Sequence, residues 1–173
     1  LKGIRVLEMS QIMAGPTCGL LLADLGAEVI KIEKTPTGDD TRNFLPPDIN
    51  GEAAAFMMMN RNKKGIALNL KEKDGIKIFK EMVKNSDVVL ENFRKGTLEK
   101  LGIGYDVVSE INPKIILCEI SGYGRTGPYS DKGGFDLVAQ GMSGLMSITG
   151  ESKDKPPMKV GAPITDITAG LLA

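Results

Sequence analysis

The sequence predicts an α/β fold in which a mostly parallel sheet carries helices on both faces, giving three layers. Short β-branched segments alternate with helical segments along the chain, and this alternation is typical of parallel sheets built from βαβ units. The chain has 173 residues, of which 42% are hydrophobic, so it can bury one core of domain size. We therefore expect one α/β domain over residues 1–173.

The first βαβ unit occupies the beginning of the chain. Residues 3–10 (GIRVLEMS) have the β-branched composition of a strand, and residues 29–33 (VIKIE) form the next one. Between them lies an apolar helical segment, which we expect to start with Pro16 as its first helical residue and to stop at Gly26. The stretch 35–50 is rich in Pro, Gly and Asp and predicts a long functional or mobile loop.

A second series of elements follows this loop. Residues 63–70 (KKGIALNL) predict a strand, and Ile76, Phe79, Met82 and Val83 have the spacing of a helix that buries one face. The next expected elements are a strand at 87–93, a helix at 105–111 that Pro113 ends, and a strand at 114–124. Residues 135–150 are predicted to be helical despite Gly141 and Gly144, which we expect to allow close packing.

Composition excludes several classes of function. Lys plus Arg (22) equal Asp plus Glu (22), so no overall basic field favours nucleic acid or an anionic membrane as a partner. The absence of His excludes the usual zinc sets and His-based triads, and no metal site is expected. No apolar run reaches the roughly 18 to 20 residues of a membrane span.

The two cysteines and the chain ends bear on location. Cys18 and Cys118 lie in apolar segments and are expected to be small buried side chains in a reducing compartment rather than a disulfide. We expect a cytoplasmic protein, with mitochondria and peroxisomes as alternatives, because a targeting signal could precede Leu1. The chain begins without Met and stops within a predicted helix, so we expect it to be part of a longer polypeptide.

Asp166 is the single charged residue between Val160 and Ala173, and two interpretations of it remain open. In the first, Thr165 or Asp166 caps a helix that runs through Ile167 to Ala173. In the second, a carboxylate in apolar surroundings at a helix N-terminus is an ionised and poorly solvated nucleophile.

Strand ends offer candidate ligand-binding residues, because ligands of doubly wound sheets bind beyond the carboxyl ends of the strands. Basic side chains gather at these positions and in the nearby segments 60–64 and Arg42, which favours a phosphate-bearing ligand. Glu33 stands where a dinucleotide-binding fold has its ribose-binding acid, but the glycines Gly15 and Gly19 do not form the G-x-G-x-x-G pattern that such a fold needs.

Five segments in register resemble family III CoA-transferases, the group that includes formyl-CoA and carnitine CoA-transferases and α-methylacyl-CoA racemase. They are QIMAGPTCGLLLADLGAEVIKIEK, NRNKKGIALNLK, DVVLENFRKGTLEKLGIGYD, NPKIILCEISGYGRTGP and GGFDLVAQGMSGLM. The resemblance implies a Rossmann-like large domain, of which residues 1–173 would be the N-terminal CoA-binding part. It also implies a smaller second domain and an interlocked homodimer.

The resemblance also implies a set of site residues. Coenzyme A would be bound as a substrate, without a permanent cofactor, by Met13, Ala14, Lys34, Leu68, Asn69, Leu70, Lys71, Asn92, Phe93, Arg94, Lys100, Gly133, Gly134 and Phe135. Lys34, Lys71 and Arg94 would hold phosphates. Gln11 departs from the family, in which many members carry Arg, and this puts one charge contact in doubt.

By the same resemblance Asp166 is the nucleophile, and Asp136 is an acid near the thioester. The implied reaction transfers CoA from an acyl-CoA to a small carboxylic acid through an aspartyl anhydride and an aspartyl-CoA thioester. The racemase branch of the family uses a His where this chain has Phe135, so the absence of His disfavours racemisation. A non-catalytic CoA- or nucleotide-binding module is the remaining alternative.

Overall fold

The computed structural model describes residues 1–152 and 154–173, and its centre is a sheet of five parallel strands. The strands are β1 (Arg5–Glu8), β2 (Glu28–Glu33), β5 (Lys64–Ala67), β6 (Val88–Glu91) and β7 (Ile116–Glu119). They lie in the order β5-β2-β1-β6-β7, and every neighbouring pair is parallel. The predicted strands are therefore confirmed; β2 is one residue longer than the predicted segment, and the others are shorter.

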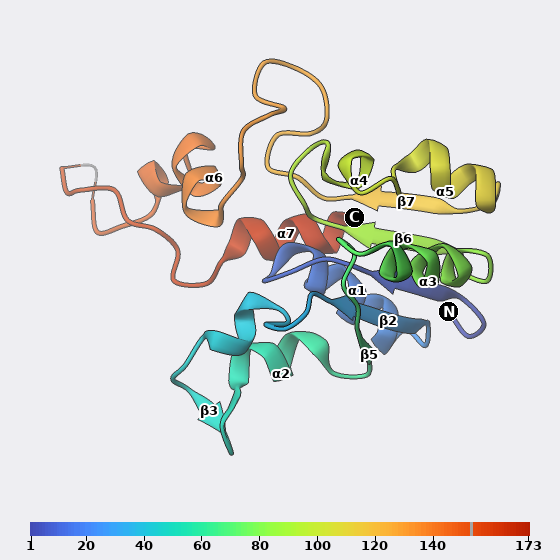
Figure 1. Cartoon of the computed structure of the whole chain (residues 1–173). Helices are drawn as coiled ribbons and strands as arrows, with labels where there is room; N and C mark the ends of the chain where they lie inside the picture. The colour runs from blue at the N-terminus through green and yellow to red at the C-terminus, as the bar shows by residue number, and fades with distance from the viewer. Residues whose placement is uncertain (153) are drawn as a thin grey trace.

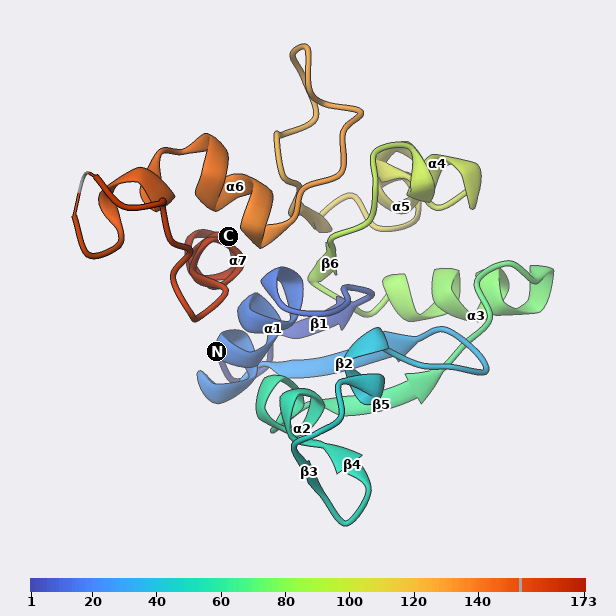
Figure 2. The ribbon, with the colours of Figure 1, turned by 90° about the vertical axis from the view of Figure 1, so that its left-hand side faces the viewer.

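Helices cover both faces of this sheet, as Figure 2 shows. On one face are α3 (Lys73–Val83), α4 (Thr97–Lys100) and α5 (Tyr105–Ile111), and on the other are α1 (Ala14–Asp24) and α7 (Ile164–Leu172). Because side chains alternate along a strand, Leu7 packs under α3 while its neighbour Val6 packs under α1. The three-layer α/β prediction is confirmed.

The helix at 14–24 differs from its prediction at one end. It begins at Ala14, so Pro16 is its third residue and not its first. Proline is tolerated there because the N–H groups of the first turn have no partner within the helix. Gly26 follows the last turn with φ of 95°, the left-handed conformation in which a glycine ends a helix at least cost.

The segment predicted as a long loop contains short elements. They are a 3-10 turn η1 (Asp40–Asn43), a hairpin of β3 (Asp48–Ile49) and β4 (Glu52–Ala53), and helix α2 (Ala54–Asn60), which packs against α1. Figure 1 shows this segment as an extension from the sheet. Asp39 caps the 3-10 turn through its side chain, an Asx-type cap that a count of Pro, Gly and Asp does not reveal.

The last predicted helix before residue 150 is also divided. Helix α6 (Asp136–Met142) ends before Gly144, which has φ of 82°, and a 3-10 turn η2 (Leu145–Ile148) follows. Gly144 therefore ends a helix and does not serve close packing within one, because its left-handed backbone interrupts the helical path. In the described part of the chain, no helix has the length and hydropathy needed to cross a membrane.

Candidate active site

Two cavities open at the carboxyl ends of the strands. The first, about 430 Å³, includes Asp166 in its lining and is called the Asp166 cavity; the second, about 450 Å³, includes Lys71 and is called the Lys71 cavity. Both use residues that follow β1 and β6, the two strands between which the order of the sheet reverses direction. This switch point is where doubly wound sheets bind ligands.

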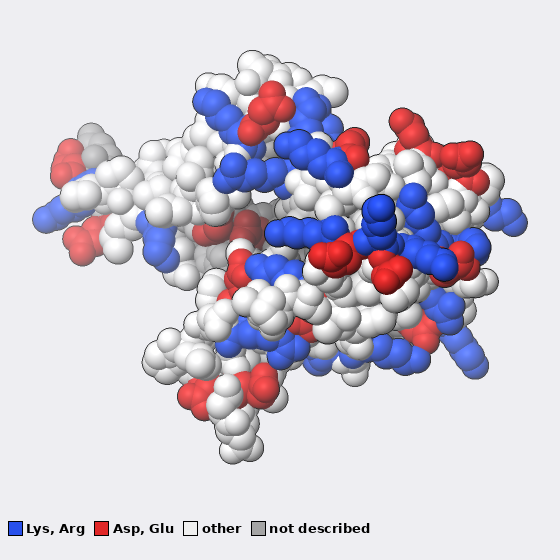
Figure 3. All heavy atoms as spheres, in the orientation of Figure 1, with Lys and Arg blue, Asp and Glu red and all other residues white. Residues whose placement is uncertain are grey.

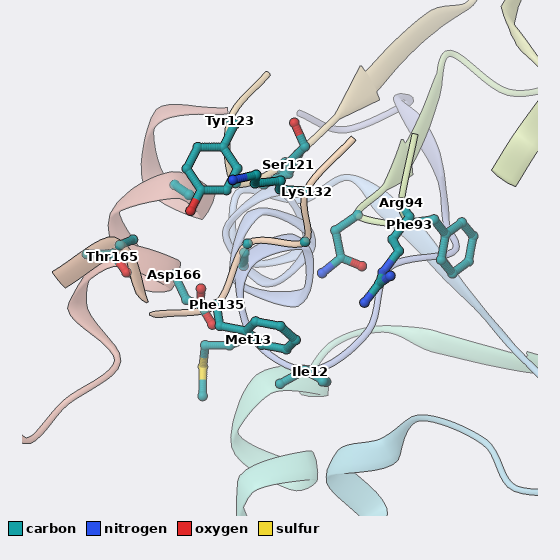
Figure 4. A pocket seen from close by; sticks show the side chains of 18 of the residues that line it. Ile12, Met13, Phe93, Arg94, Ser121, Tyr123, Lys132, Phe135, Thr165 and Asp166 are labelled. Atoms are coloured by element: carbon teal, nitrogen blue, oxygen red, sulfur yellow. The ribbon is translucent and has the colours of Figure 1, made fainter. Parts of the chain in front are cut away.

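Most of the expected site residues meet at these two cavities. The Asp166 cavity is lined by Met13, Ala14, Asn92, Phe93, Arg94, Gly133, Gly134, Phe135 and Asp166. The Lys71 cavity is lined by Lys34, Leu68, Asn69, Leu70, Lys71 and again Phe93. Figure 4 shows Asp166 and Thr165 across the first cavity from Arg94 and Phe93. Phe93 borders both cavities, so the two cavities are neighbours.

Two of the expected residues line neither cavity. Lys100 is exposed at the end of α4, next to Leu101 and one turn after Thr97, both of which line the Lys71 cavity. Asp136 lies behind the wall of the Asp166 cavity and contacts Thr165 there. Its carboxylate holds Thr165, which lines the cavity, through these hydrogen bonds.

A buried cluster of charges fixes the turn after β1. The Lys31 ammonium group lies 2.8 Å from an Asp39 carboxylate oxygen and 3.1 Å from a Glu8 carboxylate oxygen, and all three side chains are almost fully buried. Asp39 also accepts the N–H of Ile12, at 3.1 Å. Ile12 has φ of 68°, which is unfavourable for a β-branched residue, so this hydrogen bond helps to hold a strained residue in the cavity wall.

The second lysine of this cluster is Lys63. Its ammonium group lies 2.7 Å from Glu8 and donates to the Pro16 carbonyl at 2.9 Å, within the first turn of α1. Burial lowers the pKa of Lys63 to about 8, although Glu8 acts against the shift. Gly19 approaches Glu8 so closely that a Cβ there would lie 1.9 Å from the carboxylate. The cluster therefore sets the position of α1, whose start lines the Asp166 cavity.

Asn92 ties the turn after β1 to the turn after β6. Its side-chain oxygen accepts the N–H of Gln11 at 2.8 Å, and its amide group donates to the Gln11 carbonyl at 2.7 Å. The Asn92 side chain is thus used by the protein itself, and it holds the floor between the two cavities. Gln11 borders both of them.

The basic side chains of segment 60–64 and Arg42 line neither cavity, contrary to the sequence prediction, and each is paired with a carboxylate. Arg61 pairs with Asp24, Lys63 with Glu8 and Lys64 with Glu28. Arg42 forms two hydrogen bonds to Glu33, at 2.7 and 2.8 Å. Figure 3 shows many Lys and Arg side chains next to acidic ones on one face of the molecule. These partners lie nine to 55 positions away in the sequence, so local composition does not reveal them.

Neither Thr165 nor Asp166 caps α7, so the capping interpretation is wrong. The helix begins at Ile164 after Pro163, and Asp166 is its third residue. Asp136 accepts the Thr165 N–H at 2.9 Å and the Thr165 hydroxyl at 2.7 Å, so the capping carboxylate comes from α6. Within the described residues, no hydrogen bond to the Asp166 carboxylate is found. Asp166 is thereby left available at the cavity wall.

The two carboxyl groups have pKa values shifted in opposite directions. Burial, and then the nearby charge of Asp136, raise the pKa of Asp166. Burial acts to raise the pKa of Asp136 too, but the hydrogen bonds from Thr165 and Gln140 outweigh it and lower that pKa. Desolvation and a like charge therefore act against the ionised form of Asp166. A poorly solvated carboxylate is also more reactive as a nucleophile.

Sequence reasoning missed a loop that forms much of the Asp166 cavity. Between β7 and α6 the chain contributes Ser121, Gly122, Tyr123, Ser130 and Lys132 to the lining. The strand-end rule indicates its first residues, but nothing local indicates Ser130 or Lys132. They return to the cavity because Gly122 and Gly134 touch, a Cβ on either lying 2.3 Å from the other's Cα.

Comparison with known proteins identifies the family. The family model described as CoA-transferase family III matches residues 1–173. This chain belongs to CoA-transferase family III. A mouse succinyl-CoA:glutarate CoA-transferase is 47% identical over 173 residues, covering 100% of this chain and 39% of the mouse protein. A Streptomyces avermitilis formyl-CoA:oxalate CoA-transferase is 44% identical over 175 residues, covering 100% of this chain and 42% of that protein.

A solved structure supports the same assignment of fold. The CAIB/BAIF family protein from Brucella suis superimposes with a TM-score of 0.94 at 44% identity, covering 99% of this chain and 46% of that one. The chain therefore spans about 40% of the length of the family III relatives that it matches.

Proposed function

We propose that the protein transfers coenzyme A from an acyl-CoA to a carboxylic acid, with Asp166 as the nucleophile. The observation that carries the proposal is the position of Asp166. It is a half-buried carboxylate with a raised pKa, it lines a cavity at the switch point of the sheet, and its expected capping role is filled by Asp136. A carboxylate that no structural hydrogen bond occupies is free to attack a bound thioester.

The proposed reaction proceeds through two covalent intermediates. The Asp166 carboxylate attacks the thioester carbonyl carbon and expels CoA thiolate, which leaves a mixed anhydride. The thiolate then attacks the aspartyl carbonyl, forming an aspartyl-CoA thioester and releasing the donor acid. The acceptor carboxylate repeats both steps in reverse order and regenerates Asp166. Each step exchanges one carboxylate or thiolate for another, so the cycle needs no net proton transfer, metal or redox group.

The long axis of the proposed ligand follows the two cavities. The nucleotide end would lie in the Lys71 cavity, where Lys71 supplies positive charge and Lys34 is paired with Asp40 at 2.6 Å, and the thioester would lie near Asp166. Phe93 and the aliphatic side chains of Leu68 and Leu70 would contact the adenine and pantetheine groups. A covered cavity also limits hydrolysis of the anhydride and thioester intermediates, which water would destroy.

The other two functions have less support. Racemisation needs an acid and a base on opposite sides of the α-carbon. By the family resemblance one of them is a His at the position of Phe135, which lines the cavity and has no titratable group. A binding module without chemistry has no use for a carboxylate exposed to the ligand. The acids in the relatives' names, which include glutarate and oxalate, are the first acceptors to test, with succinyl-CoA as donor.

Replacing Asp166 by Asn tests the proposal directly. Asn has nearly the same shape and no hydrogen bond is lost, so the full-length Asp166→Asn variant should fold and bind CoA as the wild type does. It should lose CoA transfer by about three orders of magnitude or more, because its amide cannot form the anhydride.

A trapping experiment supplies the control for this variant. Hydroxylamine added during turnover should convert Asp166 of the wild type to a hydroxamate, detected by peptide mass, and should leave Asp136 unmodified. Transfer by the Asn variant at a rate near that of the wild type would remove Asp166 from the mechanism.

A further inference from the structure

Two loops that follow neighbouring strands form opposing parts of the Asp166 cavity. Residues 92–95, here called the β6 loop, follow β6, and residues 121–134, the β7 loop, follow β7. Both loops contribute lining residues, among them Arg94 and Lys132. The distance between the two loops therefore determines the width of the cavity.

The buried carboxylate of Glu91 touches both loops. It is the last residue of β6 and has no exposed surface. One of its oxygens accepts the N–H of Phe93, in the β6 loop, at 2.6 Å. The other forms an ion pair with Arg125, in the β7 loop. A single side chain thus connects the two loops from below the cavity floor.

Few other contacts can replace this connection. Arg125 also pairs with Glu119, at 2.8 Å, but Glu119 ends β7 and only anchors the β7 loop to its own strand. Lys95 reaches Ser130 at 3.0 Å and Asp131 at 3.5 Å, and its side chain is 42% exposed. Exposed pairs of this kind contribute little, so the buried pair of Glu91 with Arg125 is the stronger link.

The β7 loop is a compact unit whose position one contact can fix. Its two ends meet at Gly122 and Gly134, and within it the Tyr123 and Tyr129 rings pack edge to face with centroids 5.5 Å apart. A compact loop with adjacent ends is packed by its own side chains, so we expect this one to move as a whole. Releasing Arg125 should therefore displace Ser130 and Lys132 together, and not Arg125 alone.

We propose that Glu91 is a positioning residue that, through Arg125, holds the β6 and β7 loops at the separation that acyl-CoA binding requires. The inference rests on the proposed function, because it assumes that the ligand lies between these loops. Only the ionised form of Glu91 can pair with Arg125, so the connection between the loops depends on pH.

The charges around Glu91 set the pH range. The groups that face it are Arg125 and Glu119. Burial raises the pKa of Glu91 to about 7 and outweighs the opposing effects of the Phe93 N–H and of Arg125, while Glu119 adds to the increase. Glu91 is thus ionised above about pH 7 and becomes protonated below it, where the pair with Arg125 is lost. Affinity for CoA should fall as the pH falls through neutrality.

Calorimetric titration of CoA into the full-length protein tests this inference. Wild-type affinity should be about tenfold weaker at about pH 6 than at about pH 8, since the binding-competent fraction follows the ionisation of Glu91. Glu91→Gln and Arg125→Gln should both bind CoA weakly at both pH values. In each variant, the ratio of the affinity at the higher pH to that at the lower pH should shrink to the part that titration of the CoA phosphates contributes. The double variant should resemble either single one, because both substitutions break the same contact.

Glu110→Gln is the matched control. Glu110 is an exposed residue of α5, and its replacement should leave both the affinity and its pH dependence unchanged. If the variants of Glu91 and Arg125 keep the wild-type ratio of CoA affinities between the two pH values, the inference is overturned and the proposed function is not. A wild-type protein that binds no CoA at either pH would overturn the proposed function and the inference together.

Discussion

A lysine can hold a phosphate only if no carboxylate of the protein already occupies its ammonium group. Lys64 lies 2.5 Å from Glu28, and Lys63 is buried against Glu8. Lys71, by contrast, is exposed at the rim of its cavity, and within the described residues it forms no ion pair. Lys63 and Lys64 lie at the amino end of β5, whereas Lys71 follows its carboxyl end, so both position and pairing distinguish Lys71 from the other two.

This difference predicts the result of two alanine substitutions. Lys71→Ala in the full-length protein should weaken CoA binding by about 1 to 3 kcal/mol, the usual magnitude for a charge-assisted contact. Lys64→Ala removes the same charge from the amino end of β5, away from both cavities, and it should leave CoA affinity within about 0.5 kcal/mol of the wild type. Calorimetry measures both. Equal losses in the two variants would mean that the effect is general electrostatics and that Lys71 makes no specific contact.

At the scale of the element, helices with a periodic apolar pattern were predictable, whereas the starts of α1 and α7 were not. Helix α5 (Tyr105–Ile111) has the predicted bounds, and α3 was found from the spacing of Phe79 and Val83, because each helix buries one face against the sheet. The predicted start of α7 was wrong because the residue that caps the helix, Asp136, is 29 positions before Thr165 in the sequence. No local sequence pattern can indicate a cap that another helix supplies.

The same physical reason explains which part of the site was predictable. Strand ends in a parallel sheet converge, so the segments after β1, β5 and β6 were expected at one edge, and the family resemblance implied Met13, Lys71 and Asn92 within them. Ser130 and Lys132 could not be placed, because their position depends on how the β7 loop closes at Gly122 and Gly134. Ion pairs such as Lys63 with Glu8 depend on tertiary contacts in the same way.

Substitution of Asp136 tests its role at the start of α7. Asp136→Ala leaves the Thr165 N–H without its acceptor and should lower the free energy of unfolding by about 1 kcal/mol, as expected for a lost cap. Asp136→Asn keeps one side-chain oxygen that can accept this N–H, so its loss should be a few tenths of a kcal/mol. Chemical denaturation of the full-length variants measures both values. A stable Asp136→Ala variant would show that α7 does not depend on Asp136.

At the scale of the whole molecule, a large apolar surface lies along α6, η2 and α7. Phe135, Leu137, Met142, Ile148 and Leu172 are each more than half exposed. Single exposed apolar side chains are common, but several of them on elements that contact one another indicate a surface that another part of a protein covers. The relatives are more than twice as long as this chain, so they contain enough additional sequence to cover it.

Residues 1–173 expressed alone should therefore be less stable than the full-length protein and should not transfer CoA. The exposed surface along α6 and α7 directly adjoins the Asp166 cavity, so without its cover water reaches Asp166 and hydrolyses any covalent intermediate. The expected signs are a lower melting temperature, binding of a hydrophobic dye, and no exchange of CoA between succinyl-CoA and glutarate under conditions in which the full-length protein turns over. Weak CoA binding should persist, because the Lys71 cavity lies on the opposite side of Phe93 from this surface. Turnover by a monomer of residues 1–173 would show that the site is complete within this chain and that neither a second domain nor a partner subunit is needed for the chemistry.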